Sequence, residues 1–348
     1  MAADKGQTYP SEAKRYADEA TENYVVRLTD PAHQSWLPAY YGRAISRRSD
    51  FLLYSSDRSG ALQACRLDLK SGQSRALTSA PDLVTGSLTL TPDEREFAYL
   101  AGRSLFLTRL NGEHTREVYR AEEGFNFGVG YSLSEDGLVS ALVEEKPGVS
   151  RLRLITMRTG VANTLVESPD AILDPQPRPK RAGLLYRKGD DLFVVNYDAT
   201  QNRKLRIAPG PLAMALWSGD GKSIDYLNIP PDGKQLHSIR EVTPDSNDDQ
   251  FLSPTTQFVA FNRNSDTSVF VGASGSKASP YVLLLVRSVK RELTLCEHRA
   301  SDPQMVTTLF SPNSQRIFFQ SDRDGKMAIY TMAVDRLVEE TETEADQN

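Results

Sequence analysis

The sequence predicts an all-β fold, a seven-bladed β-propeller, from three observations: a repeat of forty-odd residues, short alternating strands within each repeat, and tight polar turns between those strands. The clearest copies are residues 45–78, ISRRSDFLLYSSDRSGALQACRLDLKSGQSRALT, and residues 310–334, FSPNSQRIFFQSDRDGKMAIYTMAV. Five weaker copies lie between them. A period in the forties filled with short strands is typical of propeller blades.

The number of blades follows from the residue that opens the first polar turn of each copy. These residues are Ser46, Thr91, Ser134, Arg178, Ser218, Asn262 and Ser311, at intervals of 45, 43, 44, 40, 44 and 49 residues. Seven openings predict seven blades.

The ends of the repeat array predict how the ring closes. The last copy ends near Val334 after three strands and lacks a fourth. The segment YVVRLT, residues 24–29, resembles the end of the first copy, so we expect it to be the outer strand of the last blade. The propeller is then closed by the N-terminal strand, which removes the exposed edges of an open stack.

Three segments are predicted from composition. Residues 16–334 form one propeller domain. Residues 1–15 are a flexible N-terminal segment, with a short helix expected around residues 11–20. Residues 335–348, DRLVEETETEADQN, are an acidic tail almost devoid of apolar side chains, which predicts disorder.

Charge and composition exclude several classes of protein. The 348 residues carry a net charge of −5, from 41 basic and 46 acidic side chains, without a Lys/Arg stripe, so we expect no nucleic-acid partner. No apolar run is long enough to span a membrane, and the polar N-terminus lacks a secretory signal, so we expect a cytoplasmic protein. We also expect the protein to be a monomer. Two distant cysteines predict reduced thiols.

The short motifs favour structural roles. The Ser-Asp-Arg-x-Gly sequence at residues 56–60 and 321–325 recurs at equivalent blade positions, which favours a hairpin turn over a calcium loop. Gly128-x-Gly130 lacks the third glycine of a dinucleotide motif. None of the four histidines has a second histidine at a metal-ligand spacing: His33, His114, His237 and His298.

Aromatic and polar side chains gather ahead of the strands expected to be innermost, where one mouth of the channel forms. The candidate ligand-binding residues are Trp36, Tyr41, Arg43, Gln257 and Gln304. Flat rings and an arginine suit an acidic sugar, through stacking and charge-assisted hydrogen bonds. The structural alternative is that the rings pack between blades and Arg43 pairs with a blade carboxylate.

These phrases resemble the oligogalacturonate lyase family, within the wider group of TolB-like and WD40-like propellers. The family's opening is matched by Tyr16-x-Asp18-x-x-Thr21 and by residues 26–29, VRLT. The first blade matches through FLLYSSDRSG and LDLKSGQSRALT, the second through LTPDEREFAYL and the last through residues 310–334. The likeness runs along residues 16–334.

The resemblance implies a cytoplasmic propeller that cleaves unsaturated pectin fragments by β-elimination. It also implies a manganese-type ion held by histidines and a glutamine, with a further His and an Arg doing the chemistry. In this chain the family's His-Pro-His-Pro run is replaced by residues 305–308, MVTT, and its other histidines fall on Gln257 and Met214. Its fourth-blade arginine falls near Asp191, and Gln304 stands near its glutamine.

We therefore expect a catalytically degenerate relative that binds an acidic oligosaccharide at the channel mouth and holds no metal or other cofactor, because Met, Thr and Gln do not replace imidazole ligands. One alternative is an active lyase with a different residue set, in which Tyr41 is the base and Arg43 neutralises the uronate. The other is a propeller that binds a protein partner, as TolB-like propellers do.

Overall fold

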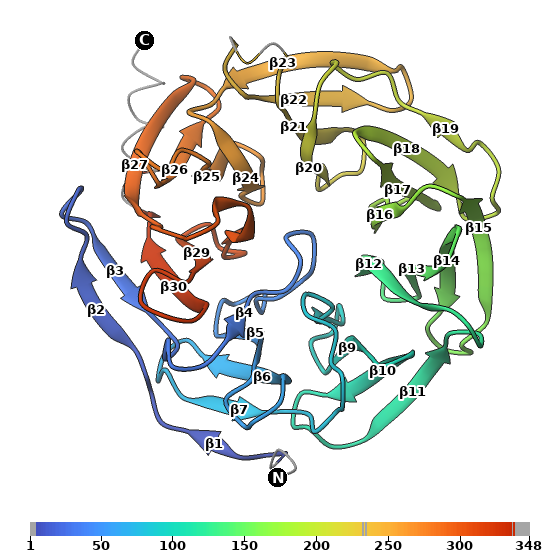
Figure 1. Cartoon of the computed structure of the whole chain (residues 1–348), viewed down its shortest axis with the longest axis horizontal. Helices are drawn as coiled ribbons and strands as arrows, with labels where there is room; N and C mark the ends of the chain where they lie inside the picture. The colour runs from blue at the N-terminus through green and yellow to red at the C-terminus, as the bar shows by residue number, and fades with distance from the viewer. Residues whose placement is uncertain (1–4, 232, 234, 336, 338–348) are drawn as a thin grey trace.

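A computed structural model describes residues 5–231, 233, 235–335 and 337. Figure 1 shows seven β-sheets arranged as blades around a central channel, which confirms the predicted seven-bladed β-propeller. One 3-10 turn, η1 (Pro303–Met305), accompanies the strands within the described residues. No helix among these residues is long and apolar enough to cross a membrane.

Each blade is an antiparallel sheet whose strands lie side by side, in order from the channel to the outer rim. Blade one contains β4 (Ser35–Trp36), β5 (Phe51–Ser56), β6 (Gln63–Asp68) and β7 (Ser74–Ala76), with β1 (Thr8–Tyr9) outside. Blade two contains β8 (Thr89–Leu90), β9 (Glu96–Ala101), β10 (Ser104–Arg109) and β11 (Thr115–Arg120), and blade three contains β12 (Asn126–Leu133), β13 (Val139–Lys146), β14 (Val149–Thr156) and β15 (Ala162–Ser168). Blade four contains β16 (Ile172–Pro177), β17 (Gly183–Lys188), β18 (Asp191–Asn196) and β19 (Arg203–Lys204).

Blades five to seven complete the ring. Blade five contains β20 (Leu212–Trp217), β21 (Ile224–Asn228), β22 (Ser238–Thr243) and β23 (Asp248–Pro254). Blade six contains β24 (Phe258–Arg263), β25 (Val269–Ser274), β26 (Tyr281–Val286) and β27 (Arg291–Glu297). Blade seven contains β28 (Thr308–Phe310), β29 (Arg316–Ser321) and β30 (Ala328–Ala333), followed outward by β3 (Tyr24–Arg27) and β2 (Lys14–Ala17).

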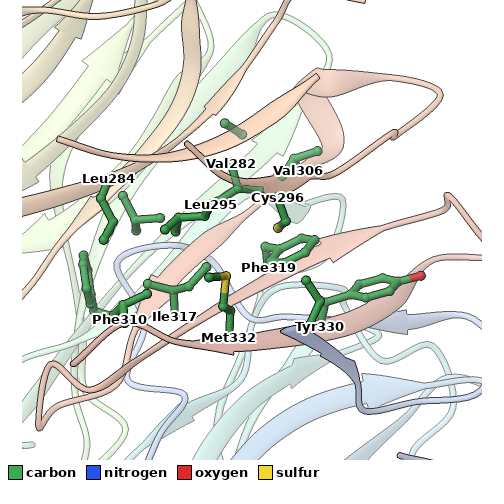
Figure 2. Close-up of a cluster of buried hydrophobic side chains, with 14 of the residues drawn as sticks. Val282, Leu284, Leu295, Cys296, Val306, Phe310, Ile317, Phe319, Tyr330 and Met332 are labelled. Carbon is green, nitrogen blue, oxygen red and sulfur yellow. The ribbon is translucent and has the colours of Figure 1, made fainter. Parts of the chain in front are cut away.

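The hydrophobic core lies between neighbouring blades. Figure 2 shows one such layer, in which Val282 of β26 and Phe319 of β29 belong to a single cluster that spans blades six and seven. Because a blade is covered on both faces by its neighbours, its middle strands are largely buried, and in β5 all six residues are. The two cysteines, Cys65 and Cys296, are buried with free thiols.

The polar turns repeat because a side chain closes six of the seven, all but that of blade four. The Ser46 hydroxyl accepts a hydrogen bond from the backbone N–H of Phe51 (3.2 Å), five residues further on. The openings of blades two, three, five and seven make the same bond, at Thr91, Ser134, Ser218 and Ser311. In blade six the acceptor is Asn264, two residues after the predicted opening. This bond explains why the turn openings carried the repeat signal in the sequence.

The N-terminal strands lie against the last and first blades. β3 pairs with β30, with Val26 opposite Thr331, and β2 pairs with β3. β1 pairs with β7 of blade one, so part of the segment expected to be flexible is hydrogen-bonded. The helix expected around residues 11–20 was wrong, because its residues supply the β2 edge strand instead. That this pairing holds the ring closed stays a prediction.

The acidic tail expected over residues 335–348 lies outside the described residues, except for Asp335 and Leu337.

Candidate functional site

The inner strand of blade one is interrupted by a loop that enters the channel. Trp36 pairs with Ser55, so an unbroken ladder would place residue 39 opposite Leu52. Ile45 stands there instead, which leaves six additional residues in the inner strand. The loop over residues 37–43 holds this excess, and in Figure 1 the blue chain beyond β4 extends toward the middle of the ring.

Bulges in other inner strands also bring residues into the channel. The register shifts in β12, β16, β20 and β24. In β12 a Cβ added at Gly130, whose φ is 117°, would come within 2.4 Å of the Pro175 ring, so this position requires glycine. The Gly128-x-Gly130 pair is therefore part of a bulge. The neighbouring bulge in β16 places Asp174 at a φ of 49°.

Asp174 and Arg187 form a partly buried ion pair beside the channel loop. Arg187 Nη1 donates to Asp174 Oδ2 (3.1 Å) and to the Ala213 carbonyl (2.9 Å), while Nη2 donates to the Leu212 carbonyl (2.8 Å). The Tyr41 hydroxyl donates to Asp174 Oδ1 at 3.5 Å. The loop is thereby attached to the start of blade four.

The protonation state of Tyr41 disfavours one alternative mechanism. Burial raises the pKa of the Tyr41 phenol well above its usual value, and the nearby carboxylate of Asp174 raises it further. Tyr41 therefore keeps its proton at neutral pH, which argues against the alternative in which it is the base of a lyase.

Tyr40 and Tyr41 divide the channel into two cavities, and both residues line both of them. Their rings meet edge to face, with centroids 4.8 Å apart, and Asn262 Nδ2 donates to the Tyr40 carbonyl (2.8 Å). The smaller cavity, about 150 Å³, lies toward the starts of the inner strands and contains Asp174. The larger cavity, about 340 Å³, lies where the inner strands end; we call it the strand-end cavity.

The guanidinium of Arg43 lies at the strand-end cavity and has no carboxylate partner. It donates from Nε to Leu90 O (3.1 Å), from Nη1 to Glu135 O (3.1 Å) and from Nη2 to Ser134 O (2.9 Å). No carboxylate of the described residues lies within ion-pairing distance of it. The structural alternative for Arg43, a pair with a blade carboxylate, is therefore wrong.

A second arginine, Arg263 at the end of β24, lines the same cavity. Its Nη2 donates to the Trp217 carbonyl, and its Nε lies 3.7 Å from Oδ2 of Asp225, too far for a good hydrogen bond. Trp217 contributes to the cavity wall, but its side chain is 5% exposed and packs in the core between blades four and five, with Arg178 over its ring. Two cationic groups and the residues Tyr40 and Tyr41 thus surround one space.

The five candidate ligand residues fall at different places. Tyr41 and Arg43 meet at the strand-end cavity. Gln257 and Gln304 are exposed at the opposite mouth, just before β24 and in η1, and Trp36 is half-buried in β4 and lines neither cavity. The expectation that Arg43 shares a mouth with Gln257 was wrong, because the channel loop displaces Arg43 toward the strand ends.

The residues at the positions of the family's metal ligands do not fit a manganese-type ion. Gln257, Gln304 and Met305 offer exposed amides and a thioether, which are poor ligands for such an ion. Across the described part of the chain, no three His, Cys, Asp or Glu side chains are grouped so that they could hold a metal. Asp191 lies outside the channel and pairs with Lys204 (2.7 Å).

We expect purified protein to contain no stoichiometric Mn²⁺ or Zn²⁺, because this donor set lacks imidazoles and thiolates. Elemental analysis by mass spectrometry after extensive dialysis checks this. About one tightly held transition-metal ion per chain would contradict it.

Sequence reasoning missed three charged residues of the channel: Asp174, Arg187 and Arg263. Asp174-Pro175 inside a strand-like segment was a usable signal, because proline within a strand marks a bulge. Arg187 lies four residues before Asp191, where the family's fourth-blade arginine was sought. Arg263 had no signal, since it directly follows a turn-opening residue.

Asp225 of β21 is fully buried behind Arg263. Neither of its carboxylate oxygens has a hydrogen-bond partner among the described residues. Burial raises the pKa of Asp225 to about 7, Arg263 opposes this rise and Glu241 adds to it.

The raised pKa predicts a pH-dependent loss of stability. The folded state binds the Asp225 proton more tightly than the unfolded state, so this contribution is complete below about pH 4 and is lost as the pH rises to about 7. We expect Asp225→Asn to raise the melting temperature at pH 8 and to raise it less at pH 5, as measured by circular dichroism. An equal shift at both pH values would contradict this.

The fold and the channel define a seven-bladed propeller with a cationic, aromatic-lined cavity. No family model matches the chain. The oligogalacturonide lyase of Pectobacterium atrosepticum is 23% identical over 396 aligned residues, with 95% of this chain and 98% of the relative covered. The oligogalacturonate lyase of Dickeya dadantii is also 23% identical, with the same shares covered.

Solved structures agree. An oligogalacturonate lyase in complex with manganese superposes with a TM-score of 0.88 at 21% identity, covering 96% of this chain and 98% of its own. The oligogalacturonate lyase of Vibrio parahaemolyticus superposes with a TM-score of 0.86 at 22% identity, covering 95% of this chain and 98% of its own. TolB from Acinetobacter baumannii is more distant, with a TM-score of 0.50 at 13% identity, covering 82% of this chain and 78% of its own. The predicted resemblance to the oligogalacturonate lyase family is thus confirmed along nearly the whole chain.

Proposed function

We propose that this protein is a catalytically degenerate relative of the oligogalacturonate lyases that binds an acidic oligosaccharide in the strand-end cavity. The observation that supports this most is the Arg43 guanidinium, which lines the cavity and has no ion-pair partner among the described residues. Three backbone carbonyls hold it in place, so little side-chain entropy is lost when a carboxylate binds.

The rest of the cavity suits a sugar acid. Arg263 supplies a second cation, and the ring of Tyr41 offers an apolar face for a pyranose ring. A volume of about 340 Å³ is at the lower end of the range for small-molecule sites. These features favour a small anionic ligand over a protein partner, which needs a broad surface.

Loss of lyase activity is proposed from the donor chemistry at the opposite mouth. Gln257, Met305 and Thr307 stand where the resemblance places imidazole ligands. An amide, a thioether and a hydroxyl neither hold a manganese-type ion well nor remove a proton at neutral pH. The uronate is then bound without being cleaved.

Two measurements on the same protein test this proposal. Titration calorimetry with trigalacturonate should show saturable binding. Absorbance at 235 nm with unsaturated digalacturonate should stay flat, with and without added Mn²⁺. A change in absorbance in either direction would instead support an active lyase, and absence of both binding and product would leave the protein-binding alternative.

A further inference from the structure

Asp225 is a buried acid that lies behind Arg263, one of the residues that line the strand-end cavity. Its side chain is fully buried in β21, opposite Leu216 of β20 and Glu241 of β22. Both of its oxygens lack hydrogen-bond partners among the described residues. A buried carboxylate in this state is costly unless it is neutralised by a proton or by a close cation.

The charged groups around Asp225 come from blades five and six. Arg263 approaches from the end of β24, with Nε 3.7 Å from Oδ2. Glu241 adds negative charge from β22, and Arg287, which follows β26, lies 3.7 Å from Glu241 and partly compensates it. Asp220, in the turn before β21, also acts on Arg263. Arg263 is therefore the cation that acts most strongly on Asp225, and Arg287 adds a smaller effect in the same direction.

Arg263 can interact with two negatively charged groups, an anion in the cavity and the carboxylate of Asp225. Its guanidinium lines the cavity, yet the nearest carboxylate is the buried Asp225 behind it. An anion in the cavity draws on the same positive charge that stabilises ionised Asp225. When that charge is shared, the ionised form of Asp225 loses support and the protonated form gains it.

We propose that Asp225 is a positioning residue that couples anion binding to proton uptake: an anion that binds Arg263 in the strand-end cavity causes Asp225 to take one proton from solvent. This inference rests on the proposed function, because it needs an anionic ligand in that cavity. No bond other than the O–H of Asp225 forms. The protonated acid leaves Arg263 free to direct its charge toward the ligand.

The burial that raises the pKa of Asp225 to about 7 places this exchange near neutral pH. The ligand should bind more tightly below this value, where Asp225 already carries its proton. By linkage, the same coupling makes bound ligand raise the pKa of Asp225 further.

Titration calorimetry with trigalacturonate tests the coupling. We expect wild-type protein to bind about three- to tenfold more tightly at pH 6 than at pH 8. At pH 7, heats measured in phosphate and in Tris should differ, because these buffers release protons with different enthalpies. This difference in heat gives the fraction of a proton taken up per ligand bound, and the measurement requires no variant.

Two variants test whether Asp225 is the group that takes up the proton. Asp225→Asn preserves shape and removes the titration, so we expect affinity at pH 8 to rise to its value at pH 6 and the buffer dependence to vanish. Arg263→Met keeps an apolar stem without the charge, and should weaken binding and remove the pH dependence. Asp248→Asn changes an exposed acid on β23, the outer strand of the same blade; it is the control and should leave both unchanged.

The outcomes separate the two proposals. Absence of binding at any pH would overturn the proposed function, and the coupling with it. Binding of equal strength at pH 6 and pH 8 without proton uptake would overturn the coupling alone. A pH dependence that persists in Asp225→Asn would also overturn it, because another group would then carry the proton.

Discussion

Deletion of residues 1–29 should lower the melting temperature by about 10 °C. The deletion removes β3, which pairs with β30, together with β2 and β1. Val25 is fully buried within the cluster between blades six and seven, and Leu28 is 6% exposed, so both leave apolar cavities. The segment also joins blade six, because Thr21 and Asn23 donate to the Leu295 carbonyl.

The expected size follows from these contacts. Two buried aliphatic side chains and about half a dozen hydrogen bonds amount to about 8 kcal/mol, which is about 10 °C for a chain of this length. Deletion of residues 1–13 removes β1 alone among these strands and is the matched control, with a smaller expected shift. Differential scanning calorimetry measures both, and an unchanged transition for the longer deletion would contradict closure by the N-terminal strand.

Arg43→Ala should abolish detectable binding of uronate oligomers. A charge-assisted hydrogen bond contributes about 1.5–3 kcal/mol, so the dissociation constant should rise about ten- to hundredfold. Arg43 forms no ion pair among the described residues, although Glu135 and Asp136 act on it from further away, so its charge is the least replaceable in the strand-end cavity. Calorimetry with trigalacturonate measures the loss.

Controls separate charge from structure. Arg43 also ties the channel loop to blades two and three through Leu90, Ser134 and Glu135, so its truncation could loosen the loop. Arg43→Lys retains a cation that can still donate to these carbonyls and should keep part of the binding, whereas Arg43→Met removes both the charge and the three bonds and should lose binding, with its melting temperature measuring how much the loop is destabilised. Arg47→Ala removes an exposed arginine four residues away and should bind normally. Normal binding by Arg43→Met would show that the cation does not hold the ligand.

Blade number and turn positions could be predicted because each depends on local chemistry. A serine or threonine that accepts a hydrogen bond from the residue five positions on leaves a repeated trace, as Ser46 and Ser311 do. The short β2 strand left no such trace. Its residues are largely exposed, and they are extended only because the edge formed by β3 is available to pair with them.

The cavity could be predicted only in part, because its shape depends on how far inner strands depart from a regular ladder. Tyr41 and Arg43 were identified from residue type, but six additional residues in the inner strand shift Arg43 to the far end of the channel. Asp174 and Arg187 meet through a bulge, and Asp225 meets Arg263 across two blades. Such contacts join residues from different strands or blades, so no short motif records them.

A crystal structure of the protein soaked with trigalacturonate tests the central claim most directly, because it locates the ligand. We expect sugar density in the strand-end cavity, with a uronate carboxylate within hydrogen-bonding distance of the Arg43 guanidinium and a pyranose ring against Tyr41. Density at the opposite mouth, between Gln257 and Gln304, with an empty strand-end cavity would contradict the account.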